Sequence, residues 1–223
     1  MDRLHRIRLL LGEAAVQTLK SKTVMVVGCG AVGSFAIEAL ARSGVGNLIL
    51  VDFDRVEESN INRQLFAAHS TIGKPKVDVA RARIADISSD INVETFNMFW
   101  NENSDLDIKP DFVIDAIDAV PSKVALYRWC ANRGISFVAS MGAANKTDMS
   151  MIKIAPLSKT MVCPLAAKIR KLVRAENIPD FPVVYSTQNP IKNDSGVLGS
   201  IITVTGDFGL KLANFTIQKL ISK

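Results

Sequence analysis

The chain has 223 residues, of which 48% are hydrophobic and 22% are charged, and its net charge at pH 7 is +5. This composition is ordinary for a globular protein and excludes wholesale disorder, while the length suits one α/β domain with a single core. No apolar run approaches the roughly 18 residues that a membrane span needs, and the polar N-terminus is not signal-like, so we expect a soluble, cytoplasmic protein without a membrane partner.

In chain order, the first predicted elements alternate between helix and strand. Residues 2–20 are expected to be helical with a break near Gly12, residues 23–27 form a short apolar strand, and a helix from 32 to about 42 ends at Gly44. The alternation continues with strands at 48–51, 91–96, 112–114 and 135–139 and helices at 74–87 and 124–131. Such alternation predicts a mostly parallel sheet with helices on both faces.

Beyond Gly142 the pattern is less regular, with expected strands at 151–154 and 183–185 and expected helices at 165–173 and 201–220. We find no linker, repeat or low-complexity segment. The sequence therefore predicts a single Rossmann-like α/β domain over residues 1–223. Its nucleotide-binding core covers about 20–142, and an elaborated C-terminal third, about 143–223, lies on the substrate side.

A glycine-rich segment, GCGAVG at residues 28–33, lies between the first predicted strand and the helix that follows. Its glycines allow a tight turn and close approach of the backbone to a phosphate, and the helix N-terminus adds partial positive charge. Asp52 ends the next strand, where a carboxylate accepts hydrogen bonds from ribose hydroxyls. The arrangement predicts nucleotide binding, with a purely structural glycine turn as the alternative. It does not separate NAD(H) from ATP.

A second group of polar residues favours ATP. Asn60 and Arg63 follow Asp54, and Lys76 lies in the next helical segment. Cleavage of ATP between its α- and β-phosphates needs positive charge on the triphosphate and on the departing pyrophosphate, whereas a dehydrogenase has no such need. Taken singly, Arg63 fits a surface arginine and Lys76 a lysine on an exposed helix face. As a set in this order, they indicate a phosphate clamp.

A third motif comes at the end of the fourth predicted strand, where Asp115 and Asp118 flank two apolar residues. Ligands in open α/β sheets bind outside such strand ends, and a carboxylate there suits the Mg²⁺ that bridges ATP phosphates. We assign this role to Asp118 and expect Asp115 to be structural. The alternative is that the carboxylate only caps the helix that starts near Pro121.

These motifs, with the stretches "GVGNLILVDFD", "SNINRQ", "GKPKVDVA" and "VIDAIDAV", resemble the ThiF/MoeB/HesA superfamily, which is related to ubiquitin-activating enzymes. The resemblance implies adenylation of a carboxylate with Mg-ATP. It places Asp52 on the ribose, Asn60, Arg63 and Lys76 on the phosphates, and Asp118 on Mg²⁺. The expected catalytic residues are Arg63, Lys76 and Asp118. The full expected ATP-binding set is Gly28, Gly30, Ala31, Val32, Gly33, Asp52, Asp54, Asn60, Arg63, Lys76, Asp118 and Arg3.

A narrower resemblance covers nearly the whole chain. The stretches "DRLHRIRLLLGEAAVQTLKSKTVMVVG", "EALARSGVG", "SKTMVCPLAAKIRKLVR" and "VVYSTQNP" are similar to the TcdA (CsdL/YgdL) subfamily of tRNA threonylcarbamoyladenosine dehydratases. That subfamily activates the threonyl carboxylate of N6-threonylcarbamoyladenosine and closes it to a cyclic hydantoin. The resemblance also implies a homodimer in which an N-terminal arginine, Arg3 or else Arg6, reaches across to the partner. The chain departs from the subfamily at residues 141–145, which replace "GGAGG", and in a short segment between Ser186 and Ser200.

A basic segment offers a physical test of the tRNA prediction. Five basic residues fall within sixteen positions that contain no acid, and three of them recur at helical spacing; the five are Lys159, Lys168, Arg170, Lys171 and Arg174. Such a ridge suits contacts to RNA phosphates. The alternative is a solvated helix face.

The cysteines bear on the alternative functions. Cys29 and Cys130 are expected to be buried, and Cys163 is the one candidate nucleophile, although no base accompanies it. The chain has no Cys-x-x-Cys pair for zinc, which many ThiF- or MoeB-type activators of ubiquitin-like sulfur-carrier proteins possess. Adenylation of such a protein is the second hypothesis, so a sulfur-relay or ubiquitin-like partner stays open. A nucleotide-binding regulator or an NAD(P) oxidoreductase is the third.

Overall fold

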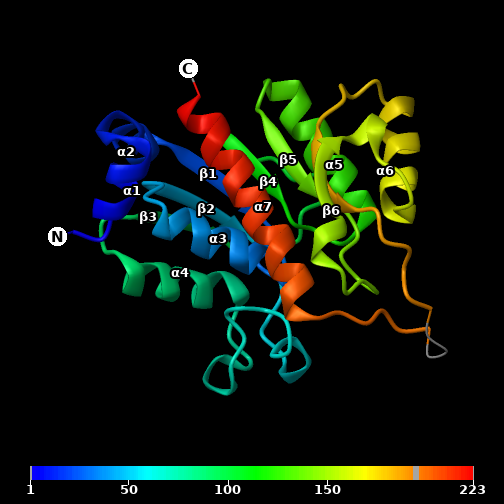
Figure 1. Ribbon diagram of the computed structural model, residues 1–223, viewed down its shortest axis with the longest axis horizontal. Coiled ribbons are helices and arrows are strands. Elements are labelled where there is room, and N and C mark those ends of the chain that lie inside the picture. The colour runs from blue at the N-terminus through cyan, green and yellow to red at the C-terminus, as the bar shows by residue number, and fades with distance from the viewer. Residues whose placement is uncertain (1, 193–195, 223) are drawn as a thin grey trace.

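The computed structural model describes residues 2–192 and 196–222. Its centre is one sheet with the strand order β3-β2-β1-β4-β5-β7-β6 (Figure 1). All neighbouring strands are parallel except β6 and β7, which pair antiparallel at one edge. The strands are β1 (Thr23–Val27), β2 (Asn47–Val51), β3 (Asn92–Phe96), β4 (Phe112–Asp115), β5 (Phe137–Ser140), β6 (Ile152–Pro156) and β7 (Pro182–Ser186).

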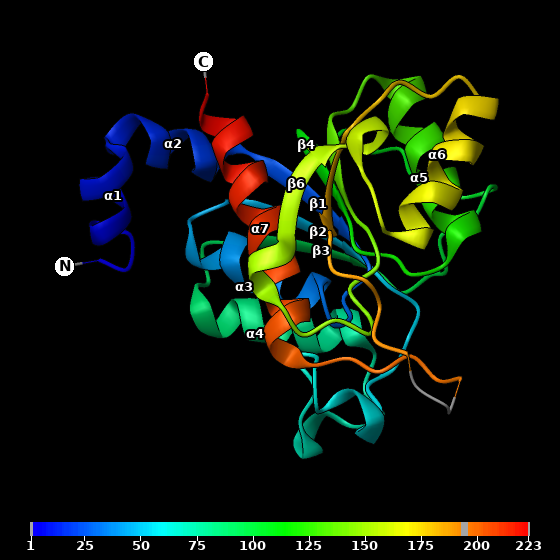
Figure 2. The same cartoon turned by 45° about the vertical axis from the view of Figure 1, so that its right-hand side comes forward.

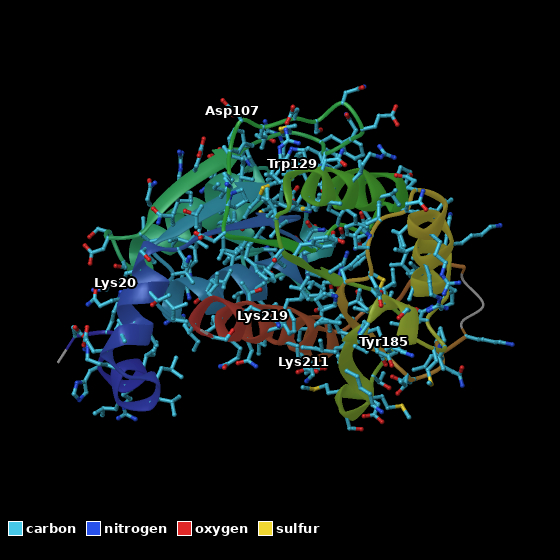
Figure 3. All side chains as sticks on the ribbon, turned by 90° about the horizontal axis from the view of Figure 1, so that it is seen from above. Lys20, Asp107, Trp129, Tyr185, Lys211 and Lys219 are labelled. Carbon is cyan, nitrogen blue, oxygen red and sulfur yellow. The ribbon has the colours of Figure 1, made fainter. Side chains whose placement is uncertain are left out.

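Helices cover both faces of this sheet, as Figures 2 and 3 show. In Figure 3 the helix that carries Trp129 and the helix that carries Lys211 lie on opposite sides of the strands. One face is covered by α3 (Gly33–Arg42), α4 (Lys76–Ile87) and α7 (Ile202–Ile221), and the other by α5 (Val120–Arg133) and α6 (Pro164–Ala175). The N-terminal helices α1 (His5–Leu11) and α2 (Glu13–Ser21) lie at one end of the molecule. The predicted three-layer Rossmann-like fold is confirmed.

The core divides into two clusters because side chains alternate across the sheet. In β1, Val24 and Val26 pack with the α3–α4–α7 layer, while Met25 and Val27 pack with the α5–α6 layer. All four are buried to 2% exposure or less. Strands buried on both faces read as continuous apolar runs, which is why β1 was recognisable from its sequence.

Tight packing of α7 against α3 positions the start of α3. A Cβ atom on Gly209 would lie 2.3 Å from the Val32 carbonyl oxygen and 2.7 Å from Phe35 Cβ. Only glycine allows this approach without a shift of backbone. The last helix thus presses on the end of α3 that carries the glycine-rich segment.

The boundaries of two helices differ from the predicted ones for clear reasons. Helix α4 begins at Lys76 rather than Lys74, since Pro75 disfavours helical backbone at the residue before it. Helix α5 begins at Val120, earlier than predicted, because Pro121 is well tolerated in a first turn. No helix of the described residues is long and apolar enough to cross a membrane.

Candidate active site

The chain changes direction across the sheet between β1 and β4. Strands β2 and β3 lie on one side of β1, and β4 lies on the other. In doubly wound sheets, ligands bind at the carboxyl ends of the strands at such a switch point. The glycine-rich loop after β1 and the turn after β4 meet there, and the loops of residues 53–75 extend from the same region (cyan in Figure 1).

The three glycines of the loop after β1 have different roles. Gly28 has φ +95°, and a Cβ atom there would lie 2.6 Å from the Ala116 oxygen. A Cβ on Gly33 would lie 1.8 Å from the Gly28 oxygen, so this glycine is required by the packing of α3 on the loop. Gly30 is not constrained in this way, since its nearest neighbour would be Gln64 Nε2 at 3.7 Å. The open space at Gly30 is what close approach of a ligand phosphate would use.

The start of α3 has unpaired backbone N–H groups that can bind an anion. Its N-cap residue, Val32, provides no side-chain hydrogen bond. Within the described residues, the N–H groups of residues 30–33 donate no hydrogen bond, whereas the Cys29 N–H is used by Asp52. Unpaired N–H groups at a helix N-terminus, together with the helix dipole, bind phosphate.

Asp52 lies immediately after β2 and faces this loop. Its Oδ2 accepts a hydrogen bond from the Cys29 N–H at 2.6 Å, and its Oδ1 accepts one from the Asp54 N–H at 2.8 Å. Burial raises the pKa of the Asp52 carboxyl, and the two backbone hydrogen bonds and the charge of Lys76 oppose that rise. The carboxylate is fixed in place, and its remaining lone pairs are available to ribose hydroxyls.

Lys76 opens α4 and points into the site rather than along an exposed helix face. Its side chain is only 8% exposed, and its Nζ lies 2.7 Å from Asp54 Oδ2. The Asp54 N–H in turn donates to Asp52, which accepts the Cys29 N–H, so these two carboxylates link the Lys76 ammonium to the glycine-rich loop. Lys76, which we predicted to bind phosphate, is therefore paired with Asp54.

Arg63 and Asn60 belong to a short 3-10 turn, Glu58–Asn60, and the residues just after it. The Arg63 Nη1 donates to the Ser59 carbonyl at 2.8 Å and to Asn62 Oδ1 at 2.9 Å. Asn60 is buried, and its Oδ1 accepts from the Glu57 N–H at 3.3 Å in a capping box. Asn60 thus shapes the loop, while the half-buried Arg63 guanidinium retains further N–H donors for an anion.

The two carboxylates after β4 have opposite surroundings. Asp115 is fully buried and bonded to Lys123 Nζ at 2.7 Å and to the Tyr127 hydroxyl, which confirms its predicted structural role. Asp118 is exposed, and within the described residues its carboxylate has no hydrogen bond or ion pair. Helix α5 has Ala119 at its N-cap and no side-chain cap, so the alternative that Asp118 caps the helix is wrong.

Several residues around the site were missed by the sequence analysis. Lys123 and Tyr127 are one and two helical turns into α5, and no local pattern shows that they converge on Asp115. Phe53 and Phe99 form an edge-to-face pair with ring centroids 4.8 Å apart, and both rings are about half exposed. Phe53 follows Asp52 directly, so this pair offers an apolar surface beside the Asp52 carboxylate.

The cysteines are unsuited to nucleophilic catalysis. Cys29, Cys130 and Cys163 are free and buried. Burial raises the pKa of the Cys29 and Cys130 thiols. Cys163 lies against Gly142, where a Cβ atom would be 3.7 Å from its sulfur, and only 3% of it is exposed. The interpretation of Cys163 as a structural residue is therefore favoured.

The basic segment keeps four of its five predicted tRNA contacts on the surface: Lys159, Lys168, Lys171 and Arg174 are exposed. Arg170 differs from these four because it is half-buried. Its Nη1 donates to the Leu157 carbonyl at 3.2 Å and to the Thr160 carbonyl at 2.9 Å, which ties α6 to the preceding 3-10 turn. Arg170 is half-buried and its Nη1 is engaged in these hydrogen bonds, and its contact with tRNA stays a prediction.

Arg3 lies apart from the glycine-rich loop of its own chain. Its Nη1 donates to the Ala41 carbonyl at the end of α3, at 3.1 Å. Helices α1 and α2 in Figure 1 lie away from the cyan loops of the site. A contribution of Arg3 to ATP binding thus requires a second chain, which is what the resemblance to the subfamily implies.

The first departure from the subfamily pattern, residues 141–145, directly follows β5 at the carboxyl edge of the sheet. Asn145 has φ +56°, a conformation that asparagine tolerates better than most residues, and its Oδ1 accepts from the Gly199 N–H at 2.7 Å. The Asn145 N–H also donates a hydrogen bond to the Gly199 carbonyl, at 2.8 Å. Residues 193–195, within the segment that we expected to be short, lie outside the described residues.

Comparison with known proteins gives a consistent result. The model of the ThiF family matches residues 2–223. A tRNA threonylcarbamoyladenosine dehydratase from Bacillus subtilis (strain 168) is 46% identical, and the match covers 86% of this chain and 77% of the relative. The Escherichia coli dehydratase TcdA in complex with AMP superposes with a TM-score of 0.93 at 32% identity, covering 98% of this chain and 94% of that one. Its complex with ATP gives a TM-score of 0.92 at the same identity, covering 98% and 93%.

Proposed function

The chain belongs to the ThiF family, and from this premise we propose that it uses Mg-ATP to adenylate the threonyl carboxylate of tRNA N6-threonylcarbamoyladenosine and then cyclises it. The observation that carries the proposal is the likeness to dehydratases over nearly the whole chain, including its C-terminal third. The adenylating core shared with other ThiF enzymes would account for ATP binding but not for the choice of substrate. The C-terminal third is where the substrate would be selected.

In the first step the substrate carboxylate attacks the α-phosphorus of ATP, and pyrophosphate leaves. The free N–H groups at the start of α3 hold phosphate oxygens, and Asp52 holds the ribose. Lys76 exchanges Asp54 for a phosphate oxygen, and Arg63 directs its free N–H donors to the departing pyrophosphate. These cations stabilise charge that grows in the transition state.

The residues present fit a magnesium ion that is held mainly by the nucleotide. Asp118 is an exposed, unpaired carboxylate at the switch point, and the described residues contain no group of three or more metal-ligating side chains. Mg²⁺ usually keeps several waters and takes one or two carboxylates along with substrate phosphates. Bound in this way, the ion would neutralise charge on the triphosphate.

In the second step the carbamoyl nitrogen of the substrate attacks the acyl carbon of the adenylate. The carbon–oxygen bond to AMP breaks, the nitrogen loses its proton, and the hydantoin ring closes. The net change is loss of one water, because one carboxylate oxygen leaves with AMP. The nucleophile is tethered to its target at high effective concentration, so no enzyme thiol is needed, in keeping with three buried cysteines.

We place the tRNA backbone along the exposed basic residues Lys159, Lys168, Lys171 and Arg174. The enzyme acts in the cytoplasm, where tRNA is found, and as a homodimer in which Arg3 of one chain reaches the ATP of the other.

The decisive test compares AMP release from Mg-ATP with tRNA that carries threonylcarbamoyladenosine and with tRNA that lacks it. We expect AMP only with the modified tRNA, together with a nucleoside that has lost one water in mass spectrometry. Release of AMP with a ubiquitin-like protein that ends in glycine, and not with modified tRNA, would favour the sulfur-carrier alternative. NAD-dependent stabilisation without an effect of ATP would overturn both.

A further inference from the structure

A buried ion pair lies beneath the switch point of the sheet. Lys123, in the first turn of α5, and Asp115, at the end of β4, have fully buried side chains, and their Nζ and Oδ2 atoms are 2.7 Å apart. The same Nζ donates to the carbonyl oxygen of Ser140, the last residue of β5, at 2.7 Å. One ammonium thereby joins two strand ends and a helix at the carboxyl edge of the sheet.

The other oxygen of Asp115 shapes the turn that carries Asp118. Asp115 Oδ1 accepts a hydrogen bond from the Ile117 N–H at 2.9 Å. The Ala116 N–H donates to the Val27 carbonyl at 2.9 Å, and the Ala116 oxygen lies where a Cβ on Gly28 would clash. The turn of residues 116–118 is therefore held on one side by Asp115 and on the other by the start of the glycine-rich loop.

We propose that Lys123 is a positioning residue for the ATP-dependent step: it orients the Asp115 carboxylate, which fixes the turn of residues 116–118 and so directs Asp118 toward the phosphates. The inference rests on the proposed function, because it takes Asp118 as the carboxylate that holds Mg²⁺. Lys123 touches neither ATP nor the ion and acts only through Asp115.

This ion pair orients the Asp115 carboxylate and adds little to the net stability of the fold. Desolvation of two buried charges largely cancels their attraction, and apolar residues of similar volume often stabilise a core as well. An apolar pair would not orient a carboxylate, however. With Lys123 and Tyr127 on Oδ2 and the Ile117 N–H on Oδ1, the Asp115 carboxylate has a single orientation.

The test uses a double variant, Lys123→Met with Asp115→Asn. Lys123→Met alone leaves a buried carboxylate uncompensated and endangers folding, whereas the double variant buries no net charge. Leu19→Ala serves as a control for lost stability. Leu19 is fully buried in α2, which leads into the opposite, amino-terminal edge of β1, so its cavity weakens the protein without touching the site.

The first readout needs neither ATP nor tRNA. Amide hydrogen exchange of a peptide that spans residues 116–118 reports directly whether the turn is held. We expect exchange at least about tenfold faster in the double variant at a temperature where both proteins are folded, and wild-type exchange at this turn in Leu19→Ala.

The second readout is turnover with modified tRNA, expressed per folded molecule. We expect the half-saturating Mg²⁺ concentration to rise about 10–100-fold in the double variant, as for other residues that orient a metal ligand. We expect kcat to fall about 10²-fold, as for a small misplacement of a reacting group. Leu19→Ala should leave both values near those of wild type.

The outcomes distinguish failure of the positioning role of Lys123 from failure of the proposed function. If wild-type protein turns over and the double variant matches Leu19→Ala in turn exchange and Mg²⁺ dependence, the positioning role is refuted and the proposed function stands. If wild-type protein releases no AMP with modified tRNA, the proposed function falls, and the role of Lys123 falls with it. Faster turn exchange together with a raised Mg²⁺ requirement supports a positioning role for the Lys123–Asp115 pair.

Discussion

The glycines of the phosphate loop allow a prediction in which two similar substitutions have opposite effects. In Gly30→Ala the added Cβ meets no atom of the chain closer than 3.7 Å, and Gly30 is not among the residues with positive φ. Such a change stabilises a folded chain by about 0.4–1 kcal/mol through the unfolded state. In Gly33→Ala the Cβ would lie 1.8 Å from the Gly28 oxygen, and relief of that overlap costs about 3 kcal/mol or more.

Although Gly30→Ala should not destabilise the fold, it should weaken ATP binding. Its Cβ would occupy the space in which a phosphate approaches the loop, so Gly30→Ala should weaken ATP by about 1–3 kcal/mol, or about 10–100-fold in Kd. Thermal unfolding with and without Mg-ATP measures both effects. Without nucleotide, Gly30→Ala should unfold within about 4 °C of wild type, and Gly33→Ala at least about 6 °C lower. A Gly30→Ala protein that binds ATP as tightly as wild type would show that the loop does not contact phosphate.

Four further predictions concern single side chains. Asp118→Ala should abolish Mg-ATP turnover while the unfolding temperature stays near that of wild type, and near-normal AMP production would refute its role. Arg63→Ala should slow adenylation about 10²–10³-fold in single-turnover assays, since it removes a cation from the transition state, and a loss under about threefold would return Arg63 to a surface role. Cys163→Ser should keep its activity in the modified-tRNA assay, whereas an inactive, folded variant would revive a thioester intermediate. Lys171→Ala should reduce the slope of log K for tRNA against log salt by about 1 in binding titrations, while the control Lys20→Ala should leave the slope unchanged.

Much of the fold was predictable because its signals are local. The apolar run of β1, the glycines after it and Asp52 at the end of β2 follow each other at spacings that the Rossmann-like fold imposes. Parallel strands buried on both faces also have a distinctive composition. These features depend on backbone geometry and burial, so a single sequence displays them.

Side-chain pairings across the fold were not predictable in the same way. Nothing near Lys76 in the sequence shows that its ammonium is held by Asp54, and nothing near Arg170 shows that its guanidinium turns toward the Thr160 carbonyl. Lys123 looks like an ordinary helix lysine, yet it is fully buried. Each of these contacts depends on where separate elements come together. Helical spacing alone does not predict such contacts.

The central claim, that the substrate carboxylate is activated by attack on the α-phosphorus, is tested most directly with an isotope. Modified tRNA whose threonyl carboxylate carries ¹⁸O would be turned over with unlabelled Mg-ATP, and the phosphorus-containing products would be analysed by mass spectrometry. The account predicts ¹⁸O in AMP, unlabelled pyrophosphate, and one AMP for each cyclised nucleoside. Cyclised nucleoside with no label in AMP, or with the label in pyrophosphate or phosphate, would contradict the acyl-adenylate.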